Sequence, residues 1–248
     1  MKNITHAFLF AISYFSTLPI FKKELDIKEE TYKYTLFFFP LVGLILALIT
    51  LGVNLFLNQF FHPVYSAIVS AVIYLALYGF LHLEAICDVA DGWFASYSGK
   101  DVYKIMKEPT IGAIGAIYSF CFVILKVAII TYVLIEEYYG LFILALIFSR
   151  LNLMYLLQSF KFNQNSFLAL AFAKDNVLNL KIIALVFVVL CMFLTSNVLT
   201  LFIISLLSFY IVMKILNKKF GFVNGDCLGF TIEHTELILL NIGMMLLL

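Results

Sequence analysis

Long apolar runs alternate with short polar segments along the whole chain. A membrane-spanning helix needs about 20 predominantly apolar residues. Runs that approach or exceed this length are Thr35–Leu57, Val64–Leu83, Ile111–Ile135, Tyr138–Leu157, Ile182–Leu194, Leu199–Leu216 and the C-terminal tail from Leu237. The uncharged stretch between Lys181 and Lys214 is too long for one span, so we expect two helices around Thr195–Asn197. The pattern predicts an all-α, polytopic membrane bundle of about six to eight transmembrane or re-entrant helices in one domain, residues 1–248.

The N-terminus resembles a signal peptide only superficially. Lys2 precedes an apolar segment, Ala7–Ile20, but no cleavage site of the A-x-A type follows. We interpret this segment as a retained first helix that either spans the membrane or lies in its interface.

Positive charge falls in every second connection between the apolar runs. Lysines occur in Phe21–Lys33, in Glu84–Thr110, in 161–181 and in 214–219, whereas Asn58–Pro63, Glu136-Glu137 and Thr195–Asn197 contain no Lys or Arg. Loops rich in Lys and Arg remain on the cytoplasmic side of a membrane. The alternation predicts that the four basic segments share the cytoplasmic face.

Composition supports a lipid environment and limits the partners. The chain is 64% hydrophobic and 12% charged, whereas a soluble domain is nearer half apolar and a quarter charged. A net charge of +1 gives no field that would attract nucleic acid. The four cysteines are widely spaced, and we expect small core residues rather than a disulfide or a metal site. Oligomeric state, including a homo-oligomer, stays open.

An acidic motif follows the second apolar run. Glu84, Asp88 and Asp91 are spaced i, i+4 and i+7, so a helix places them on one face. Like charges at this spacing repel one another, and near hydrocarbon the cost rises. A hard cation, most plausibly Mg²⁺ shared with substrate phosphates, would offset that cost. The alternative is a solvated acidic helix end.

A second acidic group lies near the C-terminus. Asp226 follows a glycine, and Glu233 and Glu236 can face the same direction on a helix. His234 falls off that face, so we expect a polar surface residue rather than a base.

Three further features suggest phosphate recognition. Gly112 and Gly115 precede or begin a span, where backbone can approach a phosphate or another helix. Lys126 and Arg150 lie within spans, and each should face the bundle interior and pair with an anion. A guanidinium can also bind phosphate through two parallel hydrogen bonds. Together these features predict phosphoryl transfer to or from a large amphiphilic substrate, with a carboxylate orienting or deprotonating the attacking hydroxyl.

Several motifs carry a family resemblance. The run His82-Leu-Glu-Ala-Ile-Cys-Asp-Val-Ala-Asp-Gly92 resembles the H-[LF]-D-G-L-A-D-x-x-D-G signature of the cobalamin synthases, the adenosylcobinamide-GDP ribazoletransferases. Ile105–Gly115 is similar to their I-M-[KR]-D-x-R-[IL]-G-x-x-G stretch, and Gly225–Glu236 to their G-D-x-L-G-A-x-x-E-x-x-E ending. Phe39-Pro40-Leu-Val-Gly43 matches an early F-P-x-[IV]-G. The motifs occur in the family's order over nearly the whole chain.

The resemblance implies the last assembly step of cobalamin biosynthesis. In that reaction a ribose hydroxyl of α-ribazole, or of its 5′-phosphate, attacks the cobinamide-bound phosphate of adenosylcobinamide-GDP, and GMP leaves. It also implies Mg²⁺ as cofactor, a multi-pass protein of the bacterial inner membrane and an active site on the cytoplasmic side. By position, the catalytic set would be Asp88, Asp91 and Asp226, and the substrate-binding set Gly112, Lys126, Arg150 and Lys161. The implied metal-ligating set is Glu84, Asp88, Asp91, Glu108, Asp226, Glu233 and Glu236.

This sequence departs from the family pattern at a few positions. Glu84 and Glu108 stand where the family usually has Asp, which keeps the charge and lengthens the reach. Thr110 replaces a basic residue, and Lys161 is the candidate substitute for a later arginine. These departures bear on substrate contacts more than on the reaction class.

Other classes remain as alternatives. A CDP-alcohol phosphotransferase would need an Ala-Arg pair after Asp91-Gly92, and a polyprenyl transferase would need two Asp-rich loops; neither is present. A cation transporter would place its carboxylates near mid-span.

Overall fold

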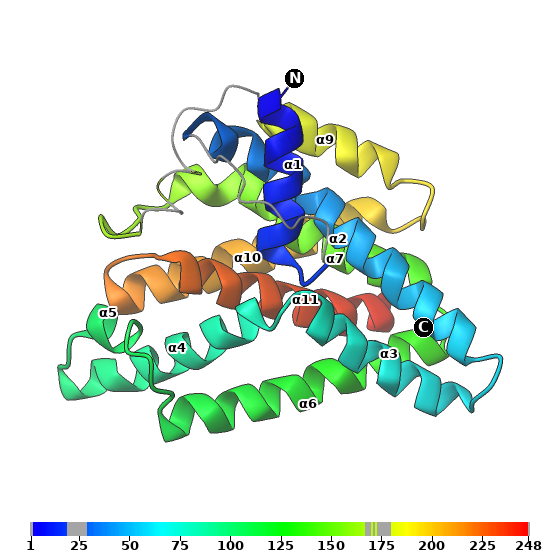
Figure 1. Cartoon of the computed structure of the whole chain (residues 1–248), viewed down its shortest axis with the longest axis horizontal. Helices are drawn as coiled ribbons and strands as arrows, with labels where there is room; N and C mark the ends of the chain where they lie inside the picture. Colours follow the sequence, from blue (N-terminus) through cyan, green and yellow to red (C-terminus); the bar gives the residue numbers. More distant parts are fainter. Residues whose placement is uncertain (1, 19–28, 167–169, 171, 173–179, 248) are drawn as a thin grey trace.

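The computed structural model describes residues 2–18, 29–166, 170, 172 and 180–247, which form helices and connecting turns with no strand among them. Figure 1 shows most of these helices running lengthwise, side by side. They are α1 (Lys2–Phe15), α2 (Glu29–Leu57), α3 (Pro63–Leu77), α4 (Leu81–Ala95), α5 (Val102–Ile105), α6 (Ala113–Ile135), α7 (Tyr139–Leu156), α9 (Leu180–Leu190), α10 (Val198–Phe220) and α11 (Gly225–Leu247), with 3₁₀ turns at Ser96–Ser98 and Leu157–Ser159.

The structure confirms the predicted fold class, an all-α bundle of membrane-spanning helices. Within the described residues, five helical segments are long and apolar enough to cross a membrane, and a sixth crossing results if the bent pair α3–α4 is one span. These segments are Tyr34–Leu57, Ala113–Ile135, Tyr139–Ser159, Val198–Phe220 and Gly225–Leu247. The chain is therefore a multi-pass membrane protein by its helix composition, and the number of spans lies at the lower end of the expectation.

Helix α7 forms the centre of the bundle. Every residue from Leu141 to Met154 is buried, because α2, α10 and α11 all pack against it. A helix that is apolar around its whole circumference requires such enclosure. The outer faces of α6 and α10 instead expose large apolar side chains, for example Phe120, Leu125, Leu207 and Ile211, which suits contact with lipid.

The expected span Val64–Leu83 is wrong as a single helix. It breaks after Tyr78, where Gly79 and Phe80 have φ of 70° and 56°, and α4 leaves at 78° to α3. The break frees carbonyl groups at the end of α3. Thr17 satisfies two of them: its N–H donates to the Leu77 oxygen at 2.7 Å, and its hydroxyl lies 3.1 Å from the Ala76 oxygen.

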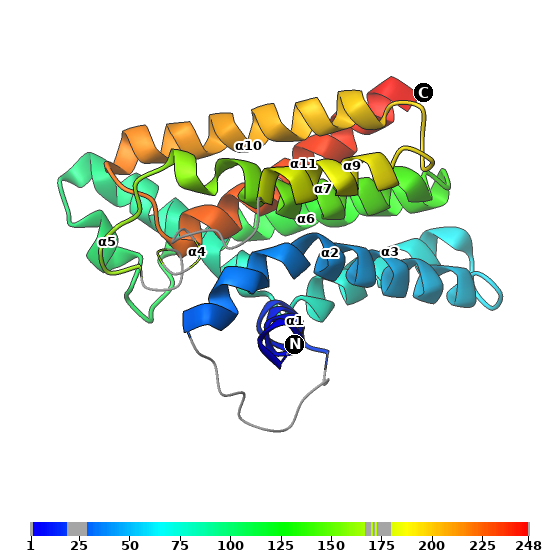
Figure 2. The ribbon, with the colours of Figure 1, turned by 90° about the horizontal axis from the view of Figure 1, so that it is seen from above.

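Two apolar helices are too short to cross the membrane alone. Helix α1 has 14 residues and runs across α2 rather than along it (Figures 1 and 2), which favours the interfacial position over a span. Where the span Ile182–Leu194 was expected, the structure has the 11-residue helix α9, which begins two residues earlier and ends at Leu190. The predicted division of this region into two helices is confirmed, because α10 begins at Val198, after the turn that contains Thr195–Asn197.

The C-terminal span begins twelve residues earlier than the predicted tail from Leu237, at Gly225. Asn224 precedes the helix, and its side-chain oxygen accepts the Cys227 N–H at 2.9 Å, as a helix N-cap does. At a rise of 1.5 Å per residue, Glu233 and Glu236 lie about 12 and about 17 Å into the helix. They are therefore near the middle of a span and not in a loop.

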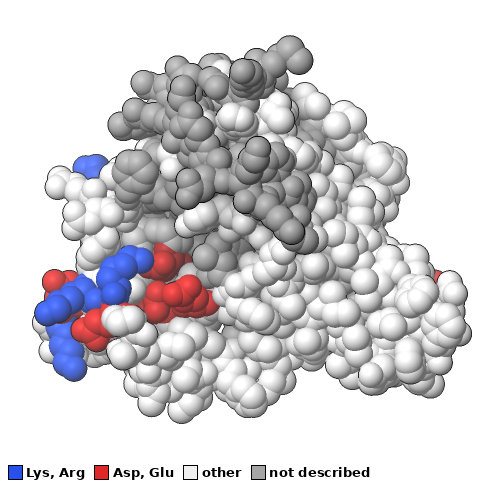
Figure 3. Space-filling model, in the orientation of Figure 1, with Lys and Arg blue, Asp and Glu red and all other residues white. Residues whose placement is uncertain are grey.

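Charged side chains gather at one end of the bundle. Figure 3 shows them close together on the visible face, at the end where α5 lies, while nearly all the remaining described surface of that face is uncharged. The connections at the other end, 58–62, 136–138 and 191–197, contain no Lys or Arg. The polar segments predicted to share one face thus do so wherever the structure describes them.

Candidate active site

The first half of the site is an open cleft between α4, the segment 108–111 and the start of α6, which we call the acidic cleft. It has a volume of about 500 Å³, and Glu84, Asp88 and Glu108 line it together with apolar residues. Glu84 and Asp88 occupy successive turns of α4, as their spacing predicted. The Asp88 carboxylate has no hydrogen-bond partner among the described residues, and the charges that act on it most strongly are those of Asp226 and Glu84. An unpaired carboxylate among other carboxylates has room for a cation.

Asp91 has a different environment from Asp88. Its two oxygens accept the backbone N–H groups of Gly112, at 2.7 Å, and Gly115, at 2.8 Å. A negative charge at a helix N-terminus is stabilising, so Asp91 fixes the start of α6 against α4. A Cβ at Gly112 or Gly115 would lie 2.4 Å from an Asp91 oxygen, which explains why both positions lack a side chain. The Gly112 N–H predicted to contact phosphate is occupied by Asp91 in this arrangement.

Asp226, at the first turn of α11, joins the cleft to the basic segment. Lys107 donates to its Oδ2 at 2.7 Å, and the Asn224 side-chain amide donates to the same atom at 2.8 Å. Burial lowers the pKa of Lys107, but the hydrogen bond and the charge of Asp226 outweigh it, so the pKa is raised above the usual value. Lys107 is therefore a permanent cation beside the carboxylates.

Lys161 lies at the same end of the bundle. It is exposed, and its neighbour Phe162 forms a parallel bridge with Val223, with the Asn163 N–H donating to the Val223 oxygen at 2.8 Å. This pairing brings the Lys161 segment to the start of α11, where Asp226 lies.

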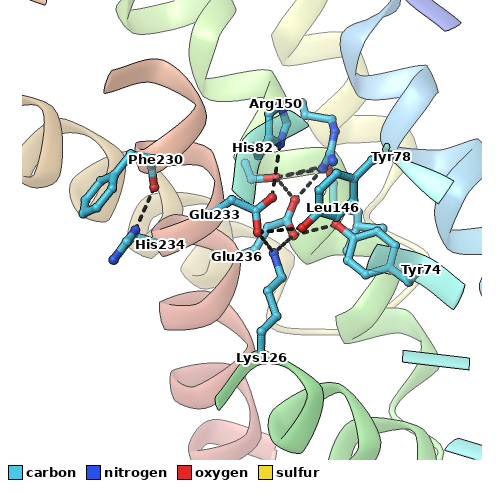
Figure 4. A network of polar contacts seen from close by, with 11 residues as sticks. Tyr74, Tyr78, His82, Lys126, Leu146, Arg150, Phe230, Glu233, His234 and Glu236 are labelled. Carbon is cyan, nitrogen blue, oxygen red and sulfur yellow. Dashed lines mark hydrogen bonds and ion pairs between the residues drawn. The ribbon is translucent and has the colours of Figure 1, made fainter. Parts of the chain in front are cut away.

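The second half of the site is a buried cluster that we call the ion network, drawn in Figure 4. Lys126 of α6 reaches both Glu233, in a short contact, and Glu236, at 2.6 Å. Arg150 of α7 pairs with the other oxygen of Glu236 at 2.5 Å. The side chains of Lys126, Glu233 and Glu236 are fully buried, and that of Arg150 is 4% exposed. The predicted pairing of both intramembrane cations with anions is confirmed.

Three further polar side chains lie against the two carboxylates. Tyr74 donates to Glu236 at 2.7 Å, Ser149 at 3.1 Å, and His82 Nδ1 lies 3.1 Å from Glu233. Buried charges are tolerated only when they are paired and hydrogen-bonded. Two carboxylates against one ammonium and one guanidinium leave no net charge, and the network ties α3, α4, α6 and α7 to α11.

The structure therefore divides the predicted metal-ligating set. Glu84, Asp88 and Glu108 share the acidic cleft, with Asp226 and Asp91 at its edges, whereas Glu233 and Glu236 are enclosed and held by Lys126 and Arg150. No three His, Cys, Asp or Glu side chains among the described residues lie close enough together to hold a metal ion by themselves. A role of Lys126 or Arg150 in phosphate binding would require their ion pairs to open.

His234 lies off the acidic face of α11, as its position in the sequence predicted, whereas the tyrosines near the ion network were not predicted. His234 faces away from the ion network (Figure 4), where Nδ1 donates to the Phe230 oxygen at 2.8 Å and Nε2 accepts from Tyr118 at 2.9 Å. Tyr74, Tyr78 and His82 were not predicted as site residues. The available signal was the spacing of four between Tyr74 and Tyr78, which places two polar groups on one face at the end of α3, whereas His82 lies beyond the break, on α4.

Together, the helices and the acidic cleft define a multi-pass membrane protein with a group of carboxylates at one end of its bundle. A family model described as cobalamin-5-phosphate synthase matches residues 7–244. This chain belongs to the cobalamin-5-phosphate synthase family.

Curated relatives match over almost the whole chain. An adenosylcobinamide-GDP ribazoletransferase of Treponema denticola is 29% identical, covering 94% of this chain and 95% of the relative. Enzymes with the same name from Clostridium botulinum (strain Langeland) and Brevibacillus brevis are 28% and 25% identical, covering 99% and 95% of this chain and 100% and 96% of the relatives. No solved structure matches.

Proposed function

We propose that this protein is an adenosylcobinamide-GDP ribazoletransferase, which performs the final assembly step of cobalamin. The family match over residues 7–244 carries this conclusion. The curated relatives that have this name match the chain over nearly their whole length. A ribose hydroxyl of the acceptor, α-ribazole or its 5′-phosphate, attacks the cobinamide-bound phosphorus of adenosylcobinamide-GDP. The bond from that phosphorus to the bridging oxygen breaks, GMP leaves, and the hydroxyl proton passes to a base.

The acidic cleft suits the diphosphate half of this reaction. The cleft has more carboxylates than cations, since Lys107 is the cation at its edge. A diphosphate would be repelled by these carboxylates, so it binds there only if further positive charge is present. We assign that charge to Mg²⁺, which Asp88 together with either Glu84 or Glu108 would hold. Mg²⁺ characteristically takes one or two carboxylates and completes its shell with water and substrate phosphates, which agrees with a cleft that lacks three converging protein ligands. Bound there, the ion would neutralise charge that develops on the phosphoryl oxygens.

The side chains of this chain supply position and proton transfer. Asp91 holds the start of α6 against α4, which fixes the width of the cleft. Lys107 offers its ammonium group to the leaving phosphate, with Asp226 orienting it at 2.7 Å. We assign the acceptance of the hydroxyl proton to Asp88, because the neighbouring negative charges of Asp226 and Glu84 favour its taking up a proton.

The cytoplasmic face of the bacterial inner membrane is the proposed location of the cleft. The connections at the cleft end carry Lys100, Lys104, Lys107, Lys218 and Lys219, and those at the opposite end carry no Lys or Arg where the structure describes them. This asymmetry orients membrane proteins with the basic side inward. A transporter is less well supported, because the two mid-span carboxylates are enclosed and neutralised by Lys126 and Arg150.

The direct test uses the purified protein in lipid vesicles with adenosylcobinamide-GDP and α-ribazole, with Mg²⁺ or with a chelator. We expect cobalamin and GMP in equal amounts with Mg²⁺ and neither product with the chelator. Absence of both products under all conditions would contradict the function, whereas undiminished turnover with chelator would contradict the metal assignment alone.

A further inference from the structure

A partly open cavity lies beside Asp226, lined by other residues of α4 than those that line the acidic cleft. It lies between α1, α2, α4, α7 and α11 and has a volume of about 140 Å³. Its walls are mainly apolar and include three phenylalanine rings: Phe15 and Phe39, whose centroids lie 4.2 Å apart, and Phe172, which lies 5.7 Å from Phe39. We call it the aromatic cavity.

Few of the described side chains that line the aromatic cavity are polar. Asp226 lines one side, where it is also bound to Lys107, and Tyr14 and His82 line others. His82 is held by its Nδ1 atom to Glu233, and Nε2 has no hydrogen-bond partner among the described residues. The described polar atoms that are fully enclosed without a partner do not include this nitrogen. Nε2 is therefore accessible from open space. Among the described residues, the cavity thus combines apolar walls with the Asp226 carboxylate, the Tyr14 side chain and the His82 ring nitrogen.

We propose that the aromatic cavity binds the base of the acceptor nucleoside, a flat and largely apolar heteroaromatic ring, with its sugar directed toward Asp226. This inference rests on the proposed function, and it assigns the acceptor subsite within it. A methylated benzimidazole has a single free ring nitrogen, which the few polar groups of the cavity can satisfy. The phenylalanine rings of the cavity offer the offset or edge contacts that aromatic rings prefer, each worth about 0.5–1.5 kcal/mol beyond area burial.

The guanine of the donor fits this cavity poorly. Guanine presents several donors and acceptors along its edges, and each one left unpaired in an apolar cavity costs about 1–3 kcal/mol. The donor's diphosphate also belongs with the lysine-bearing rim of the acidic cleft rather than with apolar walls. Asp226 lies between the two spaces, which places the acceptor sugar beside the phosphate that it attacks.

The test compares two buried phenylalanines. Phe39 lines the aromatic cavity, and Phe209 on α10 is equally buried and does not line it. Binding of α-ribazole and of free 5,6-dimethylbenzimidazole is measured by equilibrium dialysis against the full-length protein in lipid nanodiscs, without donor. Phe39→Ala should raise both dissociation constants about tenfold or more, as expected for loss of a buried aromatic contact, and Phe209→Ala should leave them unchanged. The KM for α-ribazole should rise in parallel, while the KM for adenosylcobinamide-GDP stays within about twofold.

A second variant covers the case in which Phe39→Ala does not fold. Leu153→Phe narrows the same cavity without removing a ring, and it should also weaken binding of both probes. The inference is overturned if neither probe binds the parent protein, if the donor KM rises instead, or if added phospholipid displaces both probes because the occupant is an acyl chain. If the probes bind in a manner that depends on Phe39 but the protein has no transferase activity, the proposed function is refuted and the binding site for the ring is supported. If the protein turns over its substrates but the probes do not bind in this way, the proposed function is supported and the binding site for the ring is refuted.

Discussion

Arg150 on α7 and Glu236 on α11 form an ion pair of 2.5 Å in the centre of the bundle, and neither side chain reaches the surface appreciably. Removal of one partner from a buried pair costs about 3–5 kcal/mol, mainly because the other charge remains unpaired. Arg150→Met should therefore lower the thermal unfolding temperature strongly. The double variant Arg150→Met/Glu236→Gln leaves Lys126 with Glu233, a balanced pair, and should be more stable than Arg150→Met alone.

Unfolding followed by intrinsic fluorescence in one detergent checks this order. Equal or lower stability of the double variant would show that the two side chains act independently. The double variant also tests phosphate recognition by Arg150. A raised KM for adenosylcobinamide-GDP in this charge-balanced protein would support that role, and unchanged kinetics would assign Arg150 to the ion network only.

Glycine and carboxylate act together at the start of α6. Because the Cβ of an alanine at 112 would lie 2.4 Å from Asp91, Gly112→Ala should destabilise the protein, and Asp91→Ala should cost about 1 kcal/mol through the lost helix cap. The double variant should lose less than the sum, since the alanine then occupies space that the carboxylate has vacated. Denaturant unfolding of all four proteins measures this coupling. Strict additivity would be incompatible with the contact between these residues.

The carboxylates of the acidic cleft should be essential, while those at the opposite end should not. Asp88→Asn keeps the size of the side chain but removes the charge and the proton acceptor, so transferase activity should fall by at least about 100-fold, the usual contribution of a positioned acid or base. Glu136→Gln, an exposed change at the other end of α6, is the control and should retain activity. Both variants should insert into membranes normally. Activity of Asp88→Asn equal to that of the control would remove Asp88 from the site.

Local sequence patterns predicted the elements well where one span follows one apolar run, as for Ala113–Ile135. They failed at Val64–Leu83, because the break depends on Thr17, which binds the freed Ala76 and Leu77 carbonyls from 60 residues away. They also failed at the start of α11. The charges of Glu233 and Glu236 kept this part of the helix out of the predicted apolar run, which began only at Leu237. Their pairing with Lys126 and Arg150 is what makes a span there energetically tolerable.

The site was predictable to the extent that its residues share one helix. Glu84 and Asp88 lie on adjacent turns as their spacing required, but no spacing shows that Asp91 would turn toward the N–H groups of Gly112 and Gly115. Likewise, partners of the buried cations come from helices distant in sequence. Their need for partners follows from the cost of burying a charge, whereas the identity of those partners depends on tertiary packing.

The orientation of the cleft is testable with single cysteines in a background where Cys121, the exposed native cysteine, is serine. Lys100 and Asn58 are exposed and lie at opposite ends of the bundle. In intact cells a membrane-impermeant maleimide should label Asn58→Cys and leave Lys100→Cys unlabelled until the inner membrane is opened. The reversed pattern would place the cleft outside the cytoplasm.

Gly43 and Gly52 lie on the same helix and should respond oppositely to alanine. A Cβ at Gly43 would lie 2.4 Å from the Leu146 oxygen and 3.1 Å from the Arg150 Cδ, whereas nothing lies within 4 Å of a Cβ at Gly52. Gly43→Ala must separate α2 from α7, and overpacking of this kind typically costs about 1–3 kcal/mol.

Gly52→Ala should be neutral or stabilise α2 by up to about 1 kcal/mol, the difference in helix propensity. Because Gly43 touches the stem of Arg150, its substitution should also lower activity, and Gly52→Ala should not. Thermal unfolding and transferase assays on both variants decide the matter, and equal stability of the two would mean that α2 and α7 do not approach as closely as the structure shows.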